Sequence, residues 1–332
     1  MPITITELQA DLATFALDEV LGRSEPAVLR GLCRDWPLVR AARRSDSEFA
    51  GMLAALDSGA PVDTLVMPPE AGGLVGYSAG MERFNYRHFR VPITEVLQRL
   101  AKYSRIADQP VPGVAMQSAL VADCLPGLLQ THSLPFLDAG VQPRIWIGNK
   151  VTTPTHFDGS HNIAVVACGR RRFTLFPIEQ VANLYIGPLD FAPTAAAVSM
   201  ARLDEPDFER FPKLEEALRH ARVAELEPGD ALYMPPLWWH HVESLERLNA
   251  LVNYWWRNPA PGNGLSALAH CLLAFKSLPR GERDAWKTLL QHYVFGDDDI
   301  ASHIPPERRG LLGEPDAAAM DRMKAIARNG LD

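Results

Sequence analysis

Residues 227–242 read EPGDALYMPPLWWHHV and carry the clearest structural signal in the chain. A Pro-Gly-Asp turn leads into an apolar strand, and two prolines then bend the chain before a pair of tryptophans and a pair of histidines. Other short β-like segments, separated by glycine and proline, lie at 144–148, 162–168, 172–176, 224–226, 231–234 and 248–256. Short strands at this spacing predict a sandwich or barrel.

The segments that flank this β-rich part follow helical patterns. Residues 1–113 are expected to form a flanking layer, with helices at 5–21, 45–56 and 93–100 and a strand at 27–31. After a Pro/Gly run at 258–262, apolar spacing predicts helices at 265–275, 280–293 and 316–328. The prediction is a mainly β core at 114–258 with flanking helices and a C-terminal helical region at 259–332. The polar excursion between Phe176 and Val223 is too long for a hairpin turn, which indicates a functional loop.

The composition bounds the class of protein. The chain has 332 residues, 47% of them hydrophobic, and a net charge of -7, so it can bury a sizeable core. Its basic residues form no continuous stripe, which disfavours stable nucleic-acid binding without excluding it. The four cysteines are far apart and none belongs to a CxxC pair, which argues against a zinc knuckle or a disulfide framework. Without a leader or a membrane-length apolar run, a cytoplasmic protein with no membrane partner is expected.

A candidate metal site lies in two segments. The segment 153–158, TPTHFD, places His156 and Asp158 two residues apart, so on an extended chain both side chains point the same way. The histidines that follow the tryptophan pair need a partner if one of them is buried in a β-core. Two histidines and one carboxylate on one face of an octahedron leave three positions open, as non-haem Fe(II) oxygenases require.

These motifs resemble those of the JmjC-type, cupin-like (cupin 8) 2-oxoglutarate oxygenases, in particular the asparaginyl hydroxylases of the factor-inhibiting-HIF type. The matches run in order from about Gln117 to Arg257, through the TPTHFD segment, the strand at 169–177, the acidic insert at 204–212 and the segment 252–255. The resemblance implies a double-stranded β-helix, or jelly roll, that binds Fe(II) and uses 2-oxoglutarate as co-substrate.

The resemblance also assigns roles to individual residues. It implies that His156, Asp158 and His240 are the catalytic metal ligands and that His241 faces the other way. Arg171 stands where the family has a lysine that binds the far carboxylate of 2-oxoglutarate, and its planar fork suits that role. Other residues that match the co-substrate pocket are Thr153, Asn162, Asn253 and Trp255. The family's tyrosine falls near Ala115, so either Arg171 compensates for the lost hydroxyl or the pocket accepts a different acid.

The substrate and the assembly are less determined by sequence. A hydroxylase of a protein side chain, peptide or small molecule is expected, while demethylation or oxidation of an RNA base stays open. Two alternatives are a metal-dependent cupin enzyme that does not use 2-oxoglutarate and a metal-binding module without turnover. The helical segments 264–275, 285–293 and 317–326 carry surplus apolar residues, which predicts a homodimer through these helices. In the alternative, a monomer, they close one end of the barrel.

Overall fold

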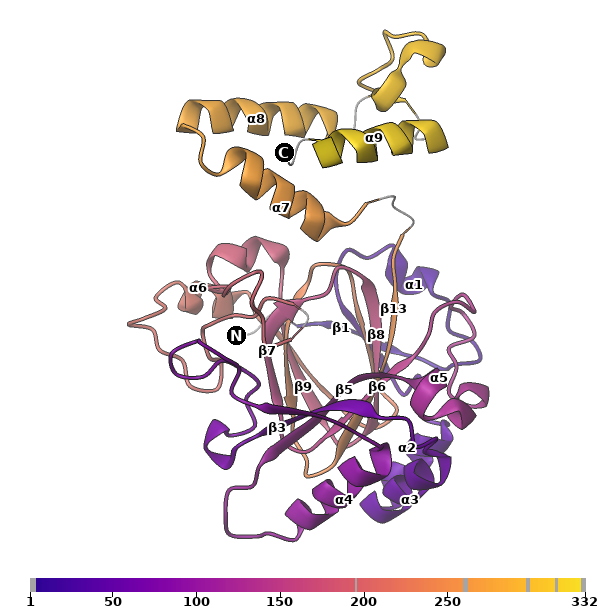
Figure 1. Cartoon of the computed structure of the whole chain (residues 1–332). Helices are drawn as coiled ribbons and strands as arrows, with labels where there is room; N and C mark the ends of the chain where they lie inside the picture. Colours follow the sequence, from indigo (N-terminus) through magenta and orange to yellow (C-terminus); the bar gives the residue numbers. More distant parts are fainter. Residues whose placement is uncertain (1–3, 195, 259–261, 297–298, 314–315, 330–332) are drawn as a thin grey trace. The chain divides into compact units, whose positions relative to one another are not determined.

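The computed structural model describes residues 4–194, 196–258, 262–296, 299–313 and 316–329. The chain divides into two units, and the first, residues 1–257, is built around two β-sheets. The large sheet has the order β1-β2-β11-β8-β13-β6-β5-β3-β4 and the small sheet the order β10-β9-β12-β7. Their bounds are β1 (Thr6–Gln9), β2 (Ala27–Arg30), β3 (Val62–Met67), β4 (Arg87–Val91), β5 (Gly113–Leu120), β6 (Arg144–Gly148), β7 (Thr152–Phe157), β8 (His161–Cys168), β9 (Arg171–Phe176), β10 (Arg222–Leu226), β11 (Ala231–Met234), β12 (Trp239–Ser244) and β13 (Asn249–Trp256). Figure 1 shows the two sheets facing each other, and the predicted jelly roll with flanking helices is confirmed.

The central strand β8 of the large sheet is apolar on both faces because each face packs against a different layer. On β8, Ala164 and Val166 belong to the cluster between the two sheets, together with Phe173 of the small sheet. The alternate residues Ile163 and Val165 belong to a second cluster on the helical side. Burial on both faces explains the near-continuous apolar run of this strand.

Helices cover the outer face of the large sheet, where Figure 1 shows α2, α3 and α4 gathered together. The elements are α2 (Pro37–Arg44), α3 (Asp46–Leu56) and α4 (Ile93–Ser104). Ser45 caps α3, and its hydroxyl accepts a hydrogen bond from the Glu48 N–H at 3.1 Å. The helices predicted at 45–56 and 93–100 are therefore confirmed, and their apolar stripes complete the second cluster.

A buried histidine fixes the start of α2. His132 follows α5 (Val121–Cys124) and the 3-10 helix η2 (Pro126–Gln130), and its Nε2 accepts a hydrogen bond from the Leu38 N–H at 3.1 Å. The ring lies edge-on to Trp36, with 5.2 Å between centroids. Burial lowers the pKa of His132 to about 4, so the ring is neutral at neutral pH and can act as this acceptor.

The helix predicted at 5–21 is wrong for most of its length. Residues 6–9 form β1, which pairs in parallel with β2 from Thr6 opposite Ala27 to Gln9 opposite Arg30. Only α1 (Asp18–Leu21) is helical within the predicted range. Strand pairing with a distant segment outweighed the local periodicity, and Ile5 still reaches the cluster between the sheets.

The long polar excursion forms a structured insert, residues 177–221 apart from the undescribed residue 195, which covers the outer face of the small sheet. It contains the 3-10 helix η3 (Ile178–Ala182) and α6 (Leu214–Arg219). Leu184 and Leu214 of the insert share an apolar cluster with Phe176 and Trp239 of the sheet. The insert is also tied to β7, because the Ser199 N–H donates to the Thr155 carbonyl at 2.7 Å.

The second unit, residues 258–332, contains helices. They are α7 (Gly264–Phe275), α8 (Arg280–Tyr293), α9 (Ala317–Asn329) and the 3-10 helices η4 (Pro306–Arg308) and η5 (Gly310–Leu312), and the predicted C-terminal helices are confirmed. The expected boundary at 258–262 falls partly on residues 259–261, which lie outside the described residues. The first unit also contains the 3-10 helix η1 (Pro69–Ala71). Within the described ranges, no helix is long and apolar enough to span a bilayer.

Candidate metal centre

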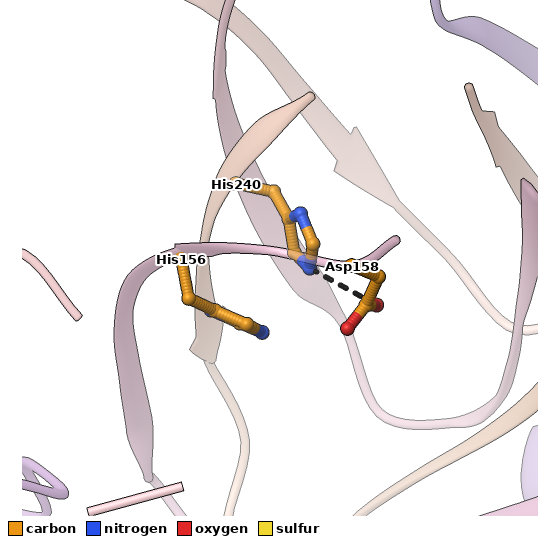
Figure 2. Close-up of side chains that lie close together, drawn as sticks. All are labelled: His156, Asp158 and His240. Carbon is orange, nitrogen blue, oxygen red and sulfur yellow. Dashed lines mark ion pairs between the residues drawn. The ribbon is translucent and has the colours of Figure 1, made fainter. Parts of the chain in front are cut away.

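Three side chains from two neighbouring strands converge in the space between the sheets. His156 lies on β7, Asp158 directly follows that strand, and His240 on β12 pairs with His156 across the antiparallel ladder. One nitrogen or oxygen of each residue lies within 4.8 Å of those of the other two. Figure 2 shows the carboxylate facing the His240 ring, where Nε2 and Asp158 Oδ2 are 3.7 Å apart. The structure thus brings together the predicted triad.

Backbone hydrogen bonds orient both imidazoles. His156 Nδ1 donates to the Pro154 carbonyl at 2.8 Å, and His240 Nδ1 donates to the Trp238 carbonyl at 3.0 Å. Each bond leaves the Nε2 lone pair free to face the centre of the triad. Burial of the His156 ring, with a smaller contribution from His240, lowers its pKa to about 4 and keeps it neutral.

This donor set suits a divalent transition metal. Two neutral imidazoles and one carboxylate match the facial triad that binds iron(II) and leaves coordination positions open. The His240 side chain is only 6% exposed, whereas that of Asp158 is 28% exposed. The carboxylate side is therefore the more open side of the site.

Two buried asparagines hold the carboxylate. Asn253 Nδ2 donates to Asn162 Oδ1 at 2.8 Å, and Asn162 Nδ2 donates to Asp158 Oδ2 at 3.4 Å. Both come from the large sheet, where Asn253 on β13 pairs with Ala164, two residues beyond Asn162 on β8. The two residues expected near the co-substrate thus form a polar chain that ends on a metal ligand.

Arg171 is a buried cation inside the β-helix. It follows Gly169, whose φ of +70° and close approach to Asn249 leave no space for a side chain in the turn before β9. Arg171 is 8% exposed, its Nε has no hydrogen-bond partner, and no carboxylate of the described residues forms an ion pair with it. Burial lowers its pKa to about 10. Because a buried charge is costly without a partner, this guanidinium favours the binding of an anionic ligand.

The neighbouring arginines differ from Arg171, as expected from strand alternation. Arg170 pairs with Glu246 at 2.8 Å and Arg172 with Glu225 at 2.6 Å, and their side chains are 50% and 41% exposed. Arg171 pairs with Ser244 of β12 and shares its face with Leu175, which pairs with His240. It therefore lies on the same interior face as the candidate metal ligands, at the start of β9 and four residues before Leu175, which corresponds to about 13 Å along the strand.

A β-bulge decides where Thr153 points. Strict alternation would place Thr153 on the face opposite His156, because the two residues are three apart. The register shifts between His240 and Val242, so Thr153 pairs with Val242, a member of the cluster between the sheets. The bulge therefore returns Thr153 to the interior side, where the co-substrate role had been expected.

The aromatic lining has a member that was not predicted. Trp255 packs edge-on against Trp146 of β6, with ring centroids 6.1 Å apart, and the indole N–H of each is buried without a partner among the described residues. Trp146 packs on the cluster between the sheets. Its signal was available in the alternation of the predicted strand at 144–148, which places it opposite to the buried Ile145 and Ile147.

Two further expectations concern His241 and Ala115. His241 is adjacent to the ligand His240 but lies outside the group of possible ligands, on the face of β12 that also bears Trp239. Burial lowers its pKa to about 4. Ala115 is buried with Leu65 and Met67 and offers no hydroxyl.

The fold and the donor set define a jelly-roll protein with a candidate site for a divalent metal. Residues 12–261 match the cupin-like domain family, and the chain belongs to this family. HSPB1-associated protein 1 of Rattus norvegicus is 35% identical over 118 residues, 35% of this chain and 24% of that protein. Lysine-specific demethylase JMJ31 of Arabidopsis thaliana is 32% identical over 126 residues, 37% and 22% of the two chains.

Jumonji C domain-containing protein 5 of Drosophila melanogaster is 34% identical over 117 residues, 35% of this chain and 28% of that protein. The match therefore spans about a quarter of each of these relatives. Among solved structures, the X-ray structure of E. coli ycfD covers 97% of this chain and 69% of its own, with 17% identity and a TM-score of 0.44. The predicted resemblance to the JmjC and cupin-like proteins is confirmed.

Proposed function

We propose that this chain is an Fe(II)- and 2-oxoglutarate-dependent oxygenase that hydroxylates a protein side chain or a small molecule. One observation carries the proposal: a buried guanidinium that has no anionic partner among the described residues shares an interior face with a two-histidine, one-carboxylate triad. A dicarboxylate that reaches from the metal to Arg171 would satisfy both ends of this arrangement.

Different residues of the chain would bind the iron and the co-substrate. His156, Asp158 and His240 would hold the iron, and the two backbone carbonyls keep the histidine tautomers that binding requires. Arg171 would bind the far carboxylate of the co-substrate, with Thr153 on the same side of the small sheet. When bound, iron and 2-oxoglutarate supply the dioxygen activation that oxidises a substrate C–H bond, with succinate and carbon dioxide as co-products.

The apolar side chains between the two sheets would protect this chemistry from water. Trp146 and Trp255 contribute large apolar surfaces, and their indole N–H groups, which have no partner in the described part of the chain, would be donors to a polar ligand. The chain Asn253–Asn162–Asp158 fixes the carboxylate orientation from the opposite sheet. Exclusion of water and fixed donors are the contributions that a protein makes to cofactor chemistry.

An anaerobic titration tests the class without knowledge of the substrate. Addition of Fe(II) and then 2-oxoglutarate to the protein should produce a metal-to-ligand charge-transfer band, and Arg171→Ala should require a much higher 2-oxoglutarate concentration for the same band. A wild-type protein that binds Fe(II) without producing the band would instead favour a cupin enzyme that does not use 2-oxoglutarate. The missing hydroxyl at Ala115 is the observation that favours this second candidate.

Substrate oxidation needs its own test. Two relatives are named as lysine-specific demethylases, and hydroxylation and demethylation begin with oxidation of a C–H bond. Succinate release that depends on a candidate peptide or metabolite would establish turnover, and formaldehyde release would distinguish demethylation from stable hydroxylation. A protein that binds metal and 2-oxoglutarate but never releases succinate above background would be a binding module.

We also propose that the C-terminal unit mediates a homodimer in the cytoplasm. Along α7 and α8, large apolar side chains are exposed, namely Leu265, Leu268, Leu272, Leu273, Trp286, Leu289 and Tyr293. No residue of either helix is buried among the described residues. Two-fold pairing is the commonest way in which such a surface is covered.

A further inference from the structure

The two strands that carry the metal ligands lose their regular pairing next to the site. Trp239 pairs with Phe157 and His240 with His156, but the next pair is Val242 with Thr153. His241 therefore faces the two residues Pro154 and Thr155. A bulge of this kind interrupts the ladder hydrogen bonds at the point where the histidine spacing is set.

Two polar side chains fill this interruption on the outer face, beneath the insert. Thr155 is 1% exposed and His241 is 3% exposed. The Thr155 hydroxyl and both ring nitrogens of His241 are buried without a hydrogen-bond partner among the described residues, as is the indole N–H of Trp239 on the same face. Buried polar atoms in native proteins are nearly always paired, so these atoms need partners that the described residues do not supply.

We infer that Thr155 and His241 are linked through one internal water molecule, and that this link positions the two metal histidines. Neighbouring strands lie about 4.8 Å apart. Across the bulge, a separation of this order leaves space for one water between the Thr155 hydroxyl and one nitrogen of the His241 ring. An internal water needs two to four polar partners, and the Thr155 hydroxyl and one nitrogen of the His241 ring supply two.

The link is placed to act on both ligands. Thr155 directly precedes His156 in the sequence, and His241 directly follows His240. Each of the two residues joined by the water is therefore the sequence neighbour of one candidate metal ligand. The Thr155 carbonyl also accepts the Ser199 N–H of the insert at 2.7 Å. The same residue therefore joins the insert to the metal strand, and neither Thr155 nor His241 touches the metal itself.

Two threonine variants and one histidine variant test the link through Co(II) binding, which requires neither 2-oxoglutarate nor turnover. Thr155→Val keeps the shape and removes the hydroxyl, whereas Thr155→Ser keeps the hydroxyl. We expect Thr155→Val and His241→Phe each to weaken Co(II) binding about tenfold and to alter the visible spectrum of the bound Co(II). Thr155→Ser should behave like the wild type. The Thr155→Val/His241→Phe double variant should bind Co(II) no more weakly than either single variant. Thr174→Val is the control, because Thr174 pairs with His241 from β9, which carries no ligand.

The unfolding of the metal-free protein in urea gives a second readout, which stays informative even if the metal site fails. Loss of a linked hydroxyl should lower the midpoint of Thr155→Val, whereas removal of an unpaired buried hydroxyl should raise it. A raised midpoint, additive losses of Co(II) affinity, or an equal effect of Thr174→Val would overturn the inference. So would a crystal structure in which the Thr155 hydroxyl bonds a backbone carbonyl with no ordered water between it and His241.

Discussion

Replacement of Arg171 with methionine should stabilise the ligand-free protein and abolish tight 2-oxoglutarate binding. The guanidinium is 8% exposed and has no ion-pair partner among the described residues, and burial lowers its pKa to about 10. The drop from the usual value corresponds to about 3 kcal/mol of destabilisation of the charged form. Methionine removes this cost and keeps an apolar stem of similar length, so we expect a gain of about 1–3 kcal/mol in the free energy of unfolding.

The same substitution should weaken 2-oxoglutarate binding about a hundredfold or more, because it removes one partner of a buried charge pair worth about 2–5 kcal/mol. Urea unfolding of the metal-free protein and anaerobic calorimetry of the Fe(II)-loaded protein measure the two effects. Arg172→Met is the matched control, since the Arg172 side chain is 41% exposed and pairs with Glu225. An Arg171→Met protein that is less stable than wild type and binds 2-oxoglutarate as before would refute the proposed role.

Three further predictions concern the metal, pH and assembly. Asp158→Ala should abolish stoichiometric Fe(II) binding while circular dichroism stays unchanged, whereas His241→Ala should still bind one equivalent. His132 has a pKa of about 4 in the folded protein and of about 6.5 when unfolded, so the unfolded chain takes up the proton first as pH falls. Stability should then decline by up to about 3 kcal/mol between pH 6.5 and 4, and His132→Gln, which keeps an acceptor for Leu38, should flatten that decline relative to wild type. Light scattering should give a dimeric mass for the wild type and a monomeric mass for Leu272→Asp/Leu273→Asp; a monomeric wild type at micromolar concentration would contradict the dimer.

The β-rich core and the shared direction of His156 and Asp158 could be predicted because both depend on local pattern. The apolar run of β8 and the Pro-Gly-Asp turn before β11 act over a few residues, and the strands formed where these signals lie. His156 and Asp158 share a direction because residues two apart on an extended chain do so. The choice of His240 over His241 came from the family resemblance, and the structure gathers His240 and not His241 with the other two residues.

Pairing between distant segments decided the remaining features. The pattern at residues 5–21 predicts a helix, but β1 pairs with β2, because ladder hydrogen bonds and burial at a sheet edge outweigh a weak local preference. Thr153 faces the interior only because the β7–β12 register shifts by one residue, which no count along a single strand reveals.

By itself, therefore, the sequence determined the class of fold, the residue types of the candidate site and the face on which Arg171 lies. Tertiary structure decided that Arg171 is a buried cation without a partner among the described residues and that Trp146 packs against Trp255. It also placed His241 opposite the register shift in β7. Burial and pairing depend on what the rest of the chain brings to a position, and that information is spread over strands far apart in sequence.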